Sequence, residues 1–559
     1  MMIDQVDWNG SEVLEEVFAH CVKPLSKADA SKTLTAFLQQ LDENSNTEEG
    51  SETSNRVFHM LLNEFEVLAK NDIDWLVCLF STHLKYGDRE AAVAKLIELV
   101  CNSSLSFEAK WFVYWQLQSH FFTLRHLYSA EYRFKLLSKA YKSLFNDFYL
   151  GLIDDLKKLK GINATFFEFP KRDLATSLKN RVVIISNQIL SAQHAPTRLC
   201  MDMAKTYIDM GFAVSVLNLA SLPSRVNTLF IGCKSYNNIG QFALPKQKIL
   251  LDRENVSLSG ASNDASCIHY LDTDIPFFQL ENLDQLAYVL LGLEQQKPAL
   301  VISISDNNLM ADAIGKSHQG DYPVVTFPTV AELPIQVATT PVLRRKPSDE
   351  LKALAGFKNY LLSQDHYPHK HESTGINRTE LGLPENKFLI SIVGSRLSIE
   401  VNDALLGCLS SLLSSSTHIS AVFIGSADLI GKIVLPEFSD RIYVLGHQED
   451  LFSTIAATDL FLNPDRVGGG TGGVMALGAG LPVATLSNNY SDVAWSVGHE
   501  FSFSSYEDIS DFVLRCAEEP EFYEEQQQTA LNKYEMKLDA RSVYQKLLDD
   551  CGVEKPFDK

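Results

Sequence analysis

The sequence has little of what secreted and membrane proteins carry. No window contains the ~18 uninterrupted apolar residues that a membrane-spanning helix needs. The opening MMIDQVDWNG lacks the basic stretch followed by an apolar run that marks a signal peptide. The 9 cysteines are dispersed without a C-x-x-C pair, as expected of free thiols in a reducing compartment. We therefore expect a soluble protein of the cytoplasm.

Positive charge is also scarce. The 49 Lys and Arg residues face 70 Asp and Glu residues, which leaves a formal net charge of −21 at pH 7. An acidic surface repels phosphate backbones and anionic lipids, so this balance disfavours nucleic-acid-binding and membrane-surface proteins. A length of 559 residues predicts three or four domains, at about 150 residues for each domain.

Glycine and proline are missing from a long stretch of the first third. Residues 107–150 contain neither, and large apolar residues recur there at every third or fourth position. That spacing places the apolar side chains on one face of a helix. The segment 89–101 repeats the pattern. We therefore predict an all-helical N-terminal domain over residues 1–175.

From residue 181 onward, short apolar runs rich in β-branched residues alternate with helical patterns. This alternation predicts a doubly wound α/β fold with parallel strands. The first series of predicted strands comprises 181–186, 212–220, 228–232, 248–252, 299–305 and 323–329. The second series comprises 387–394, 419–426, 441–446, 459–464 and 482–487. We predict two tandem Rossmann-like domains, at 176–375 and at 376–559, the second with C-terminal helices.

The most specific motif is NPDRVGGGTGG, residues 463–473. It follows a predicted strand and leads into a short helix, and its glycines allow the backbone to approach a ligand closely. The start of a helix offers unpaired N–H groups and a positive dipole end to an anion. Thr471 is suited to cap the helix or to donate to an oxyanion. We predict a phosphate site; the alternative is a flexible turn without a ligand.

Two further loops follow predicted strands of the same domain. Arg396 comes directly after the strand at 387–393, where a guanidinium can hold a diphosphate with paired donors. Its alternative role is a surface ion pair. His447 and Gln448 follow the strand at 441–445 and are candidates to contact a base or a phosphate. The alternative for these two residues is an ordinary loop.

These motifs carry a resemblance. VG-x-R at 393–396, LG-x-x-x-DL at 445–451 and NP-x-R-x-GGGT followed by G-x-PV resemble the nucleotide-sugar domain of GT-B glycosyltransferases. The likeness extends over 181–545 and is strongest at 378–500. It implies that a nucleoside-diphosphate sugar, such as a UDP-sugar, is the donor. The implied donor-binding residues are Arg396, His447, Gln448, Gly469, Gly470, Thr471, Gly472 and Asp492.

At two positions the sequence departs from one large group of GT-B enzymes, and this departure narrows the resemblance to other groups of the fold. Retaining enzymes of the large group-1 type carry two glutamates around this motif, and the matching positions here are Val467 and Met475. The pattern is more similar to the group of O-GlcNAc transferases and HMW1C-like enzymes, which place a helical module before an inverting GT-B core. This resemblance implies a metal-independent, inverting transfer to a protein or glycan acceptor, without a cofactor, and the helical module is a candidate docking site for a protein partner. The alternatives are a nucleotide-sugar epimerase of the same fold and a non-catalytic co-subunit.

The first α/β domain contributes the candidate catalytic residue. His194 lies in the loop after the first strand, and relatives have a histidine in a similar loop near the acceptor. A pKa near 6.5 suits an imidazole to general-base work or to hydrogen bonding with phosphate. The alternative is a helix cap. Thr197 and Arg198, at the start of the next helix, are expected to assist the anion site.

The remaining polar candidates differ in rank. Asp492, one of the implied donor-binding residues, is similar to the acidic residue that these glycosyltransferases have after the strand that follows the Gly-rich motif, where a carboxylate can accept hydrogen bonds from ribose or sugar hydroxyls; its alternative role is a helix N-cap. Asn307 and Asn308 follow a strand at the edge of the predicted cleft, and Gln336 lies in a segment that is similar to one preceding the hinge in the HMW1C-like group. Glu332 lies in the same segment as Gln336. These four residues, Asn307, Asn308, Glu332 and Gln336, form a second rank of candidates, which we expect near the acceptor.

Two patterns resemble metal sites only superficially. The D-x-D at 272–274 precedes a helical stretch, and three-residue matches of this kind are common by chance. His366, His369 and His371 lie in a linker without an obvious fourth ligand. We therefore expect no bound metal.

Overall fold

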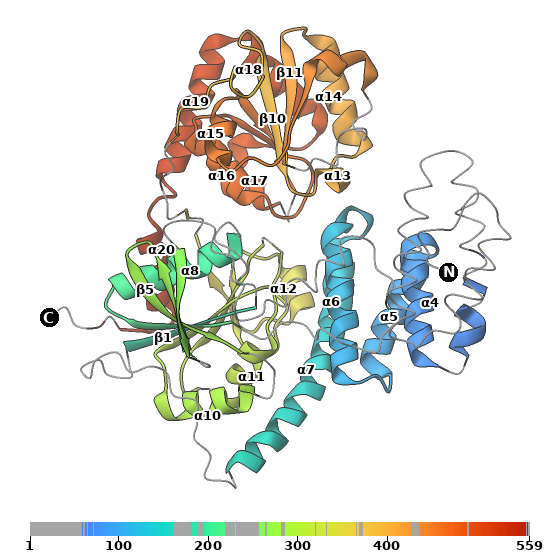
Figure 1. The fold of residues 1–559 in the computed structure, drawn as a ribbon, viewed down its shortest axis with the longest axis vertical. Coiled ribbons are helices and arrows are strands. Elements are labelled where there is room, and N and C mark those ends of the chain that lie inside the picture. Colours follow the sequence, from blue (N-terminus) through green and yellow to red (C-terminus); the bar gives the residue numbers. More distant parts are fainter. Residues whose placement is uncertain are drawn as a thin grey trace.

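The computed structural model describes most of the chain beyond residue 58. The described residues are 59, 62–63, 65–70, 72–160, 180–187, 189, 195–218, 230, 256–262, 265–280, 285–318, 320–330, 332–364, 366–367, 370, 373–425, 435–488, 491–554 and 556. They form helices between residues 73 and 160, followed by two sheets with helices around them (Figure 1). In none of the described helices is an apolar stretch long enough to cross a membrane.

The first helices form because apolar residues recur along one face of each helix and because polar side chains cap helix starts. Their bounds are α4 (Ile73–Tyr86), α5 (Arg89–Asn102), α6 (Phe107–Thr123), the 3₁₀ turn η3 (Arg125–Leu127) and α7 (Ala130–Lys160). The Asp88 carboxylate accepts the N–H of Ala91 at the start of α5, and the Ser106 hydroxyl accepts the N–H of Ala109 at the start of α6. Such caps satisfy backbone donors that have no partner inside the helix.

The first sheet has the strand order β3-β4-β5-β2-β1-β6-β7-β8-β9. Its pairs are parallel except β3–β4 and β4–β5, which are antiparallel. The bounds are β1 (Arg181–Ser186), β2 (Ala213–Asn218), β3 (Val256–Ser262), β4 (Ala265–Tyr270), β5 (Thr273–Gln279), β6 (Leu300–Ile304), β7 (Val324–Phe327), β8 (Thr340–Leu343) and β9 (Leu361–Leu362). Every residue of β1 and β6 is buried, as strands covered on both faces require.

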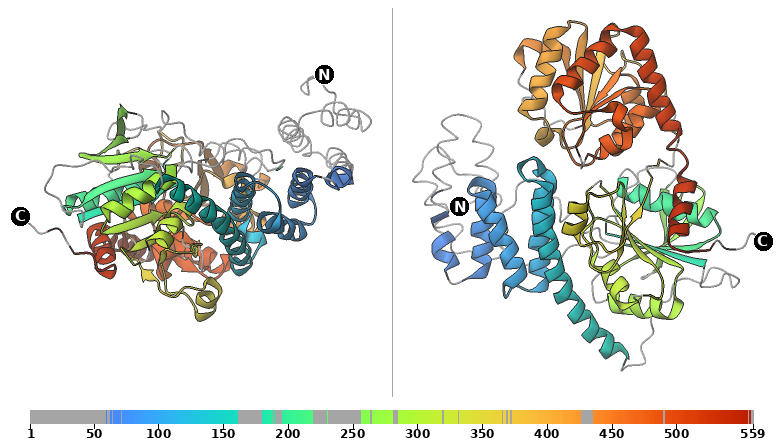
Figure 2. Two further views of the ribbon diagram at one scale, coloured as in Figure 1. Left: turned by 90° about the horizontal axis from the view of Figure 1, so that it is seen from below. Right: turned by 180° about the vertical axis from the view of Figure 1, so that it is seen from behind.

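Alternate side chains of β1 enter two different cores. Val182 and Ile184 pack with α8 (Ala195–Asp209), whereas Val183 and Ile185 pack on the other face with α10 (Leu286–Gln296) and α11 (Leu309–Ser317). The second of these cores continues into α4–α7, and α7 runs along α10, α11 and α12 (Asp349–Ala355) (Figure 2). The helical segment therefore shares its core with the first sheet.

The second sheet has the strand order β12-β11-β10-β13-β14-β15, with parallel pairs throughout. Its strands are β10 (Phe388–Gly394), β11 (Ile419–Gly425), β12 (Ile442–Leu445), β13 (Leu460–Leu462), β14 (Val483–Leu486) and β15 (Ser502–Phe503). Around them lie α13 (Leu397–Glu400), α14 (Asp403–Ser415), η8 (Pro436–Arg441), α15 (Leu451–Ala456), α16 (Gly470–Gly478), α17 (Asp492–Val497), η9 (His499–Phe501), α18 (Tyr506–Glu518) and α19 (Pro520–Glu535).

The last helix departs from the predicted domain at 376–559. Helix α20 (Ala540–Asp550) packs on α8 and the first sheet, away from the second sheet that precedes it in the chain (Figure 1). The reason is its apolar face, because Tyr544 and Leu548 are buried in the core that also contains Tyr207. The Tyr207 hydroxyl donates to the backbone oxygen of Tyr544 at 3.3 Å.

The predicted mixed α/β class with parallel sheets is confirmed. The helical domain at 1–175 and the boundary at 175/176 stay predictions, because residues 1–58 and 161–179 lie outside the described residues. The predicted strand at 248–252 also lies outside them, as does that at 228–232 apart from Phe230.

Candidate functional site

Two of the predicted loops meet where the strand order of the second sheet reverses. From β10 the chain proceeds outward through β11 and β12, and then returns to the other side of β10 as β13. Ligands of open α/β sheets bind at such a switch point, outside the carboxyl ends of the strands. Arg396 follows β10, and the Gly-rich loop, which is the NPDRVGGGTGG motif at 463–473, follows β13 and leads into α16. Nη2 of Arg396 donates to the backbone oxygen of Val467 at 3.1 Å. The structure therefore brings these two predicted elements together.

The Gly-rich loop enters α16 through two left-handed residues. Gly468 and Gly469 have φ angles of +83° and +81°. A Cβ on Gly469 would lie 2.7 Å from Nε of Arg466, so the position has no room for a side chain. The first helical hydrogen bond of this turn runs from the Gly473 N–H to the Gly469 oxygen. The preceding amides belong to the helix end that attracts anions.

Thr471 does not cap this helix. The N-cap is Gly469, without a side-chain hydrogen bond, and α16 begins at Gly470. Thr471 is the second helical residue and is half-buried. The predicted capping role is therefore wrong, and the predicted contact of Gly469, Gly470, Thr471 and Gly472 with an oxyanion stays a prediction.

A buried ion pair between Arg466 and Glu400 supports the Gly-rich loop. Nη1 of Arg466 lies 3.0 Å from Oε2 of Glu400, and Nε of Arg466 donates to Oδ1 of Asn463 at 2.9 Å. The other oxygen of Glu400 pairs with Arg396 at 2.9 Å. Burial lowers the pKa of Arg466, and the adjacent Glu400 opposes this shift. Glu400 thus ties the loops after β10 and β13 to each other.

The roles of Arg466 and Glu400 were missed by the sequence analysis. Arg466 is part of the quoted motif, so a signal for it existed. The side chain of Arg466 is 6% exposed, whereas that of Arg396 is 34% exposed. Arg396 is therefore the arginine of this pair that a ligand can reach.

Asp492 holds the Gly-rich loop from within the protein. It is 3% exposed, and its Oδ2 accepts the N–H of Gly468 at 2.6 Å. Its Oδ1 accepts Nη1 of Arg344 at 3.0 Å. The N-cap of α17 is Ser491, whose hydroxyl accepts the N–H of Ala494 at 3.1 Å, so the capping alternative for Asp492 is wrong. Contact of Asp492 with ligand hydroxyls stays a prediction.

His447 and Gln448 follow β12, the edge strand of the sheet. In the strand order, β11 separates β12 from the switch point at β10 and β13. His447 is exposed, and the Gln448 amide donates to the Gly446 oxygen at 3.5 Å. The strand order therefore sets these two residues apart from Arg396, and their donor-binding role stays a prediction.

The first sheet has its own switch point, between β1 and β6. Asn187 follows β1 and Asn307 follows β6, and the Asn187 amide donates to the backbone oxygen of Asn307 at 3.3 Å. Asn307 is 4% exposed. Within the described part of the chain, Nδ2 of Asn307 and Oδ1 of Asn187 have no hydrogen-bond partner. Buried polar groups usually have one, so this pair is suited to a polar ligand.

The neighbours of Asn307 have structural partners. Oδ1 of Asn308 accepts the N–H groups of Met310 and Ala311 and so caps α11. Asp306 accepts the hydroxyl of Thr329 at 2.8 Å, and burial raises the pKa of this carboxylate.

The remaining candidates of the first domain are less informative. His194 lies outside the described residues. Thr197 is buried in α8, and Arg198 hydrogen-bonds Tyr270. Gln336 is half-buried. The anion and acceptor roles of these residues stay predictions.

The two metal-like patterns have other partners. Asp272 pairs with Lys205 at 2.7 Å, and Asp274 pairs with His269 at 2.8 Å, in and next to the β4–β5 turn. Nε2 of His366 lies 2.8 Å from the Tyr544 hydroxyl. His369 and His371 lie outside the described residues. Among the described residues, no three His, Cys, Asp or Glu side chains are grouped so that they could hold a metal ion.

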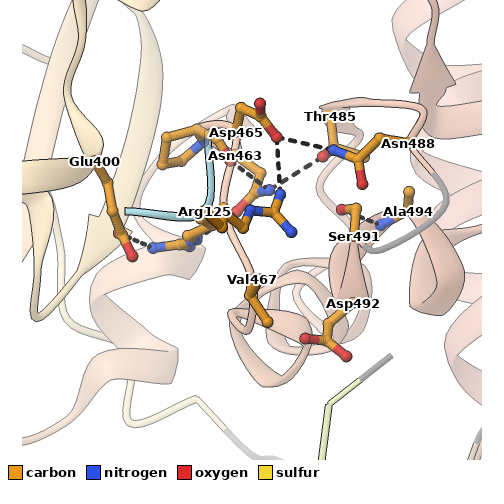
Figure 3. A network of polar contacts seen from close by, with 12 residues as sticks. Arg125, Glu400, Asn463, Asp465, Val467, Thr485, Asn488, Ser491, Asp492 and Ala494 are labelled. Atoms are coloured by element: carbon orange, nitrogen blue, oxygen red, sulfur yellow. Dashed lines mark hydrogen bonds and ion pairs between the residues drawn. The ribbon is translucent and has the colours of Figure 1, made fainter. Parts of the chain in front are cut away.

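Residues from outside the second sheet also reach the Gly-rich loop. Nη2 of Arg125, in η3, lies 2.9 Å from Oδ1 of Asp465, and Figure 3 shows this contact beside the Asp465–Asn488 hydrogen bond. The Arg396 guanidinium lies over the Phe122 ring, 4.5 Å from its centroid. The α6–η3 region, the segment after β10 and the loop after β13 therefore contact one another here.

No family model and no curated protein matches the sequence. Solved structures match. An O-GlcNAc transferase mutant from Thermobaculum terrenum is 13% identical with a TM-score of 0.44, over 94% of this chain and 98% of that chain. HepE from Anabaena with UDP and glucose is 14% identical with a TM-score of 0.44, over 66% and 99%. The pneumococcal O-GlcNAc transferase GtfA with UDP and GlcNAc is 10% identical with a TM-score of 0.42, over 67% and 99%.

The expected resemblance to glycosyltransferases is thus found as a similarity between structures. TM-scores of 0.42 to 0.44 mark a partial overlap. The fold of this chain is therefore described from its two strand orders. The proposal for its chemistry rests on the residues around the two switch points.

Proposed function

We propose that the chain is a glycosyltransferase that moves a sugar from a UDP-sugar to a protein or glycan acceptor. The observation that best supports this proposal is the junction of Arg396 with the Gly-rich loop at the switch point of the second sheet. A helix start without a side-chain cap and a reachable arginine lie together there. Both features favour an anion such as a diphosphate.

In this proposal the diphosphate lies against the first turn of α16. The N–H groups of Gly470, Thr471 and Gly472 point along the helix axis toward the ligand. Nη2 of Arg396 donates to the Val467 oxygen and to Glu400. Because a guanidinium has five N–H donors, others remain for phosphate oxygens. Donors that are preset in this way stabilise the departing diphosphate. We propose that they do so without a metal ion or a further cofactor.

The chemical step proposed is a single displacement with inversion. A lone pair of the acceptor atom forms the new bond to the anomeric carbon while the bond from that carbon to the diphosphate oxygen breaks. The acceptor proton passes to His194 as the general base, and UDP leaves with the electron pair. Val467 and Met475, at the positions of the glutamate pair of retaining enzymes, are buried and apolar, which supports a mechanism without a second carboxylate there.

The acceptor is proposed to bind at the switch point of the first sheet. Nδ2 of Asn307 is a donor and Oδ1 of Asn187 is an acceptor, and both are buried. A hydroxyl group can accept from the first and donate to the second. We therefore propose that this amide pair binds a hydroxyl group of the acceptor.

Action in the cytoplasm is part of the proposal. The cysteines of the described residues are all free thiols, at positions 78, 101, 200, 267, 408, 516 and 551. Dispersed free thiols are typical of a reducing compartment.

The proposal is tested with the full chain and a panel of UDP-, GDP- and dTDP-sugars. We expect UDP and one UDP-sugar to raise the melting temperature, because a ligand that binds the native state stabilises it. UDP release should then require an acceptor from cell extract. A converted sugar without acceptor would identify an epimerase instead. Failure of every nucleotide to bind would contradict the proposal and favour the non-catalytic co-subunit.

A further inference from the structure

We propose that the α6–η3 corner, residues 122–127, is part of the donor site and that Arg125 is a positioning residue of the reaction. This inference rests on the proposed function, because the loop that Arg125 holds is the proposed diphosphate site. Arg125 acts through Asp465, and Phe122 acts through Arg396. Neither residue needs to touch the substrate.

The first contact is a shared carboxylate oxygen. Oδ1 of Asp465 accepts from Nη2 of Arg125 at 2.9 Å and from the Asn488 amide at 2.8 Å. Asp465 lies in the Gly-rich loop, three residues before Gly468, so the contacts of Asp465 with Arg125 and Asn488 (Figure 3) restrain the first part of this loop. The Arg125 side chain is 10% exposed and that of Asp465 is 35% exposed. A charge-assisted hydrogen bond at this burial restrains the carboxylate more than a surface ion pair does.

The second contact is a cation–π contact between Phe122 and Arg396. The Phe122 ring lies 4.5 Å from the Arg396 guanidinium carbon, and Phe122 itself is 37% exposed. The ring therefore contacts the guanidinium whose Nη2 also binds the Val467 oxygen and Glu400. A planar group that is held in this way keeps one orientation, which paired donation to a diphosphate requires.

The corner is itself fixed to the rest of the molecule. Nη1 of Arg133 donates to the backbone oxygens of Arg125 and Tyr128, at 3.0 and 2.8 Å. Nη2 of Arg133 pairs with Glu332 of the first α/β unit. The buried Arg133 therefore binds the η3 turn and, through Glu332, the first α/β unit as well. These contacts restrain the position of the corner from which Arg125 reaches Asp465.

The charges support the same conclusion. Asp465 and Asp492 place two carboxylates beside a site proposed for a diphosphate, where they would repel the ligand. Each is paired with an arginine from outside the second α/β unit, Arg125 for Asp465 and Arg344 for Asp492. These arginines both position the loop and neutralise the charges that flank it.

The chain offers a matched control. Lys110 and Asp147 pair at 2.9 Å between α6 and α7, with side chains 10% and 44% exposed. This pair resembles Arg125–Asp465 in length and burial but lies within the helices. Lys110→Gln therefore removes a comparable ion pair without a contact to the Gly-rich loop.

The test compares full-length wild type with Arg125→Gln, Arg125→Lys, Phe122→Leu and Lys110→Gln. Calorimetry gives the Kd for UDP, and steady-state assays give kcat and KM. We expect Arg125→Gln to raise the Kd for UDP about tenfold, as the loss of one good charge-assisted contact does. Arg125→Lys should restore part of the affinity, and Phe122→Leu should weaken binding less. Lys110→Gln should lower the melting temperature but leave the Kd for UDP unchanged. Wild-type Kd and kcat in Arg125→Gln would overturn the inference.

Hydrogen exchange without ligand separates this inference from the proposed function. We expect faster amide exchange across residues 466–472 in Arg125→Gln but not in Lys110→Gln. Exchange at the wild-type rate in Arg125→Gln would overturn the positioning role. If wild type bound no nucleoside diphosphate, the proposed function and the donor-site part of the inference would both fail, while faster exchange would still support the restraint on the loop.

Discussion

Arg344 and Asp492, 148 residues apart in the chain, form an ion pair between the two α/β units, with side chains 14% and 4% exposed. Nη1 of Arg344 lies 3.0 Å from Oδ1 of Asp492, while the other oxygen of Asp492 accepts the N–H of Gly468. The Arg344 guanidinium also lies over the Trp495 ring, 4.7 Å from its centroid, and the Trp495 indole donates to the Arg344 backbone oxygen at 2.8 Å. The conformation of the Gly-rich loop thus depends on a residue of the first unit.

We expect Arg344→Gln to weaken UDP binding and to lower the melting temperature. The substitution leaves the Asp492 carboxylate buried without its ion-pair partner, which costs several kcal/mol at a fully buried site and about 1 to 3 kcal/mol where the carboxylate keeps a hydrogen bond. Calorimetry with UDP measures the loss of affinity. Thermal unfolding measures the loss of stability.

Arg378→Gln is the matched control for that substitution. Arg378 pairs with Asp459 at 2.7 Å, with side chains 18% and 21% exposed, and the pair lies within the second unit. The Arg378→Gln variant should have a lower melting temperature than wild type but the same Kd for UDP. Equal Kd values for Arg344→Gln and wild type would show that the Arg344–Asp492 ion pair is not needed to hold the loop in its binding conformation.

Gly469→Ala should destabilise the protein and weaken nucleotide binding. The left-handed φ angle of +81° costs an L-residue about 1 to 2 kcal/mol. In addition, the new Cβ would meet Nε of Arg466 at 2.7 Å, and Arg466 is fixed by Glu400 and Asn463. Thermal unfolding and UDP titration measure the two effects.

Gly407→Ala provides the opposite expectation. Gly407 lies inside α14, and a Cβ there would meet nothing within 4 Å. Alanine should stabilise the helix by roughly 0.5 to 1 kcal/mol and leave UDP binding unchanged. A Gly469→Ala variant that unfolds and binds like Gly407→Ala would contradict the described geometry of the loop.

The sequence predicted one half of this site and not the other. Arg396 and the Gly-rich loop each follow a strand, so a local pattern of strand, loop and helix was enough to find them. They meet because β10 and β13 are neighbours at the switch point, which follows from the general strand order of doubly wound folds. The fold class was predictable for the same reason, since alternation and β-branched runs are local signals.

The residues that support the loop carried no such signal. Arg125 and Asp465 are 340 residues apart, and no periodicity relates them. Asp492 was assigned a possible capping role that Ser491 fills, because both residue types suit an N-cap and only the backbone decides between them. Helix α20 was assigned to the second domain because chain order places it there, whereas its apolar face packs on the first sheet.

Stability should depend on pH through Asp312, which joins α11 to α7. Oδ2 of Asp312 accepts the Tyr141 hydroxyl at 2.7 Å, and Oδ1 accepts the N–H groups of Val337 and Ala338. Burial raises the pKa of Asp312 from 3.8 to about 6. The folded state therefore binds this proton more tightly than the unfolded state does. Its contribution to stability is fully present below pH 3.8 and is lost as the pH rises to about 6.

The Asp312→Asn variant isolates that contribution, because its amide does not titrate. The difference in unfolding free energy, wild type minus Asp312→Asn, should fall by about 3 kcal/mol between pH 3.5 and pH 7, at 1.36 kcal/mol for each pKa unit. Denaturant unfolding at several pH values measures this difference. A difference that is constant with pH, or that rises, would show that folding does not raise the pKa of Asp312.

Asn307→Ala should affect the acceptor and not the donor. The substitution removes the buried Nδ2 donor that is proposed to bind an acceptor hydroxyl. We expect a higher KM for the acceptor, about tenfold, in line with the loss of one buried hydrogen bond. The Kd for UDP should stay at the wild-type value, because Asn307 lies at the first sheet. An unchanged acceptor KM would place the acceptor elsewhere.

Titration of wild type and Arg396→Ala with UDP by calorimetry tests the central claim most directly. Arg396 is the reachable arginine at the switch point, and the Gly-rich loop lies next to it. The account predicts that wild type binds one UDP per chain and that Arg396→Ala binds it at least about tenfold more weakly, since a paired arginine–phosphate contact is lost. Absence of UDP binding by wild type, or equal affinity of the two proteins, would contradict it.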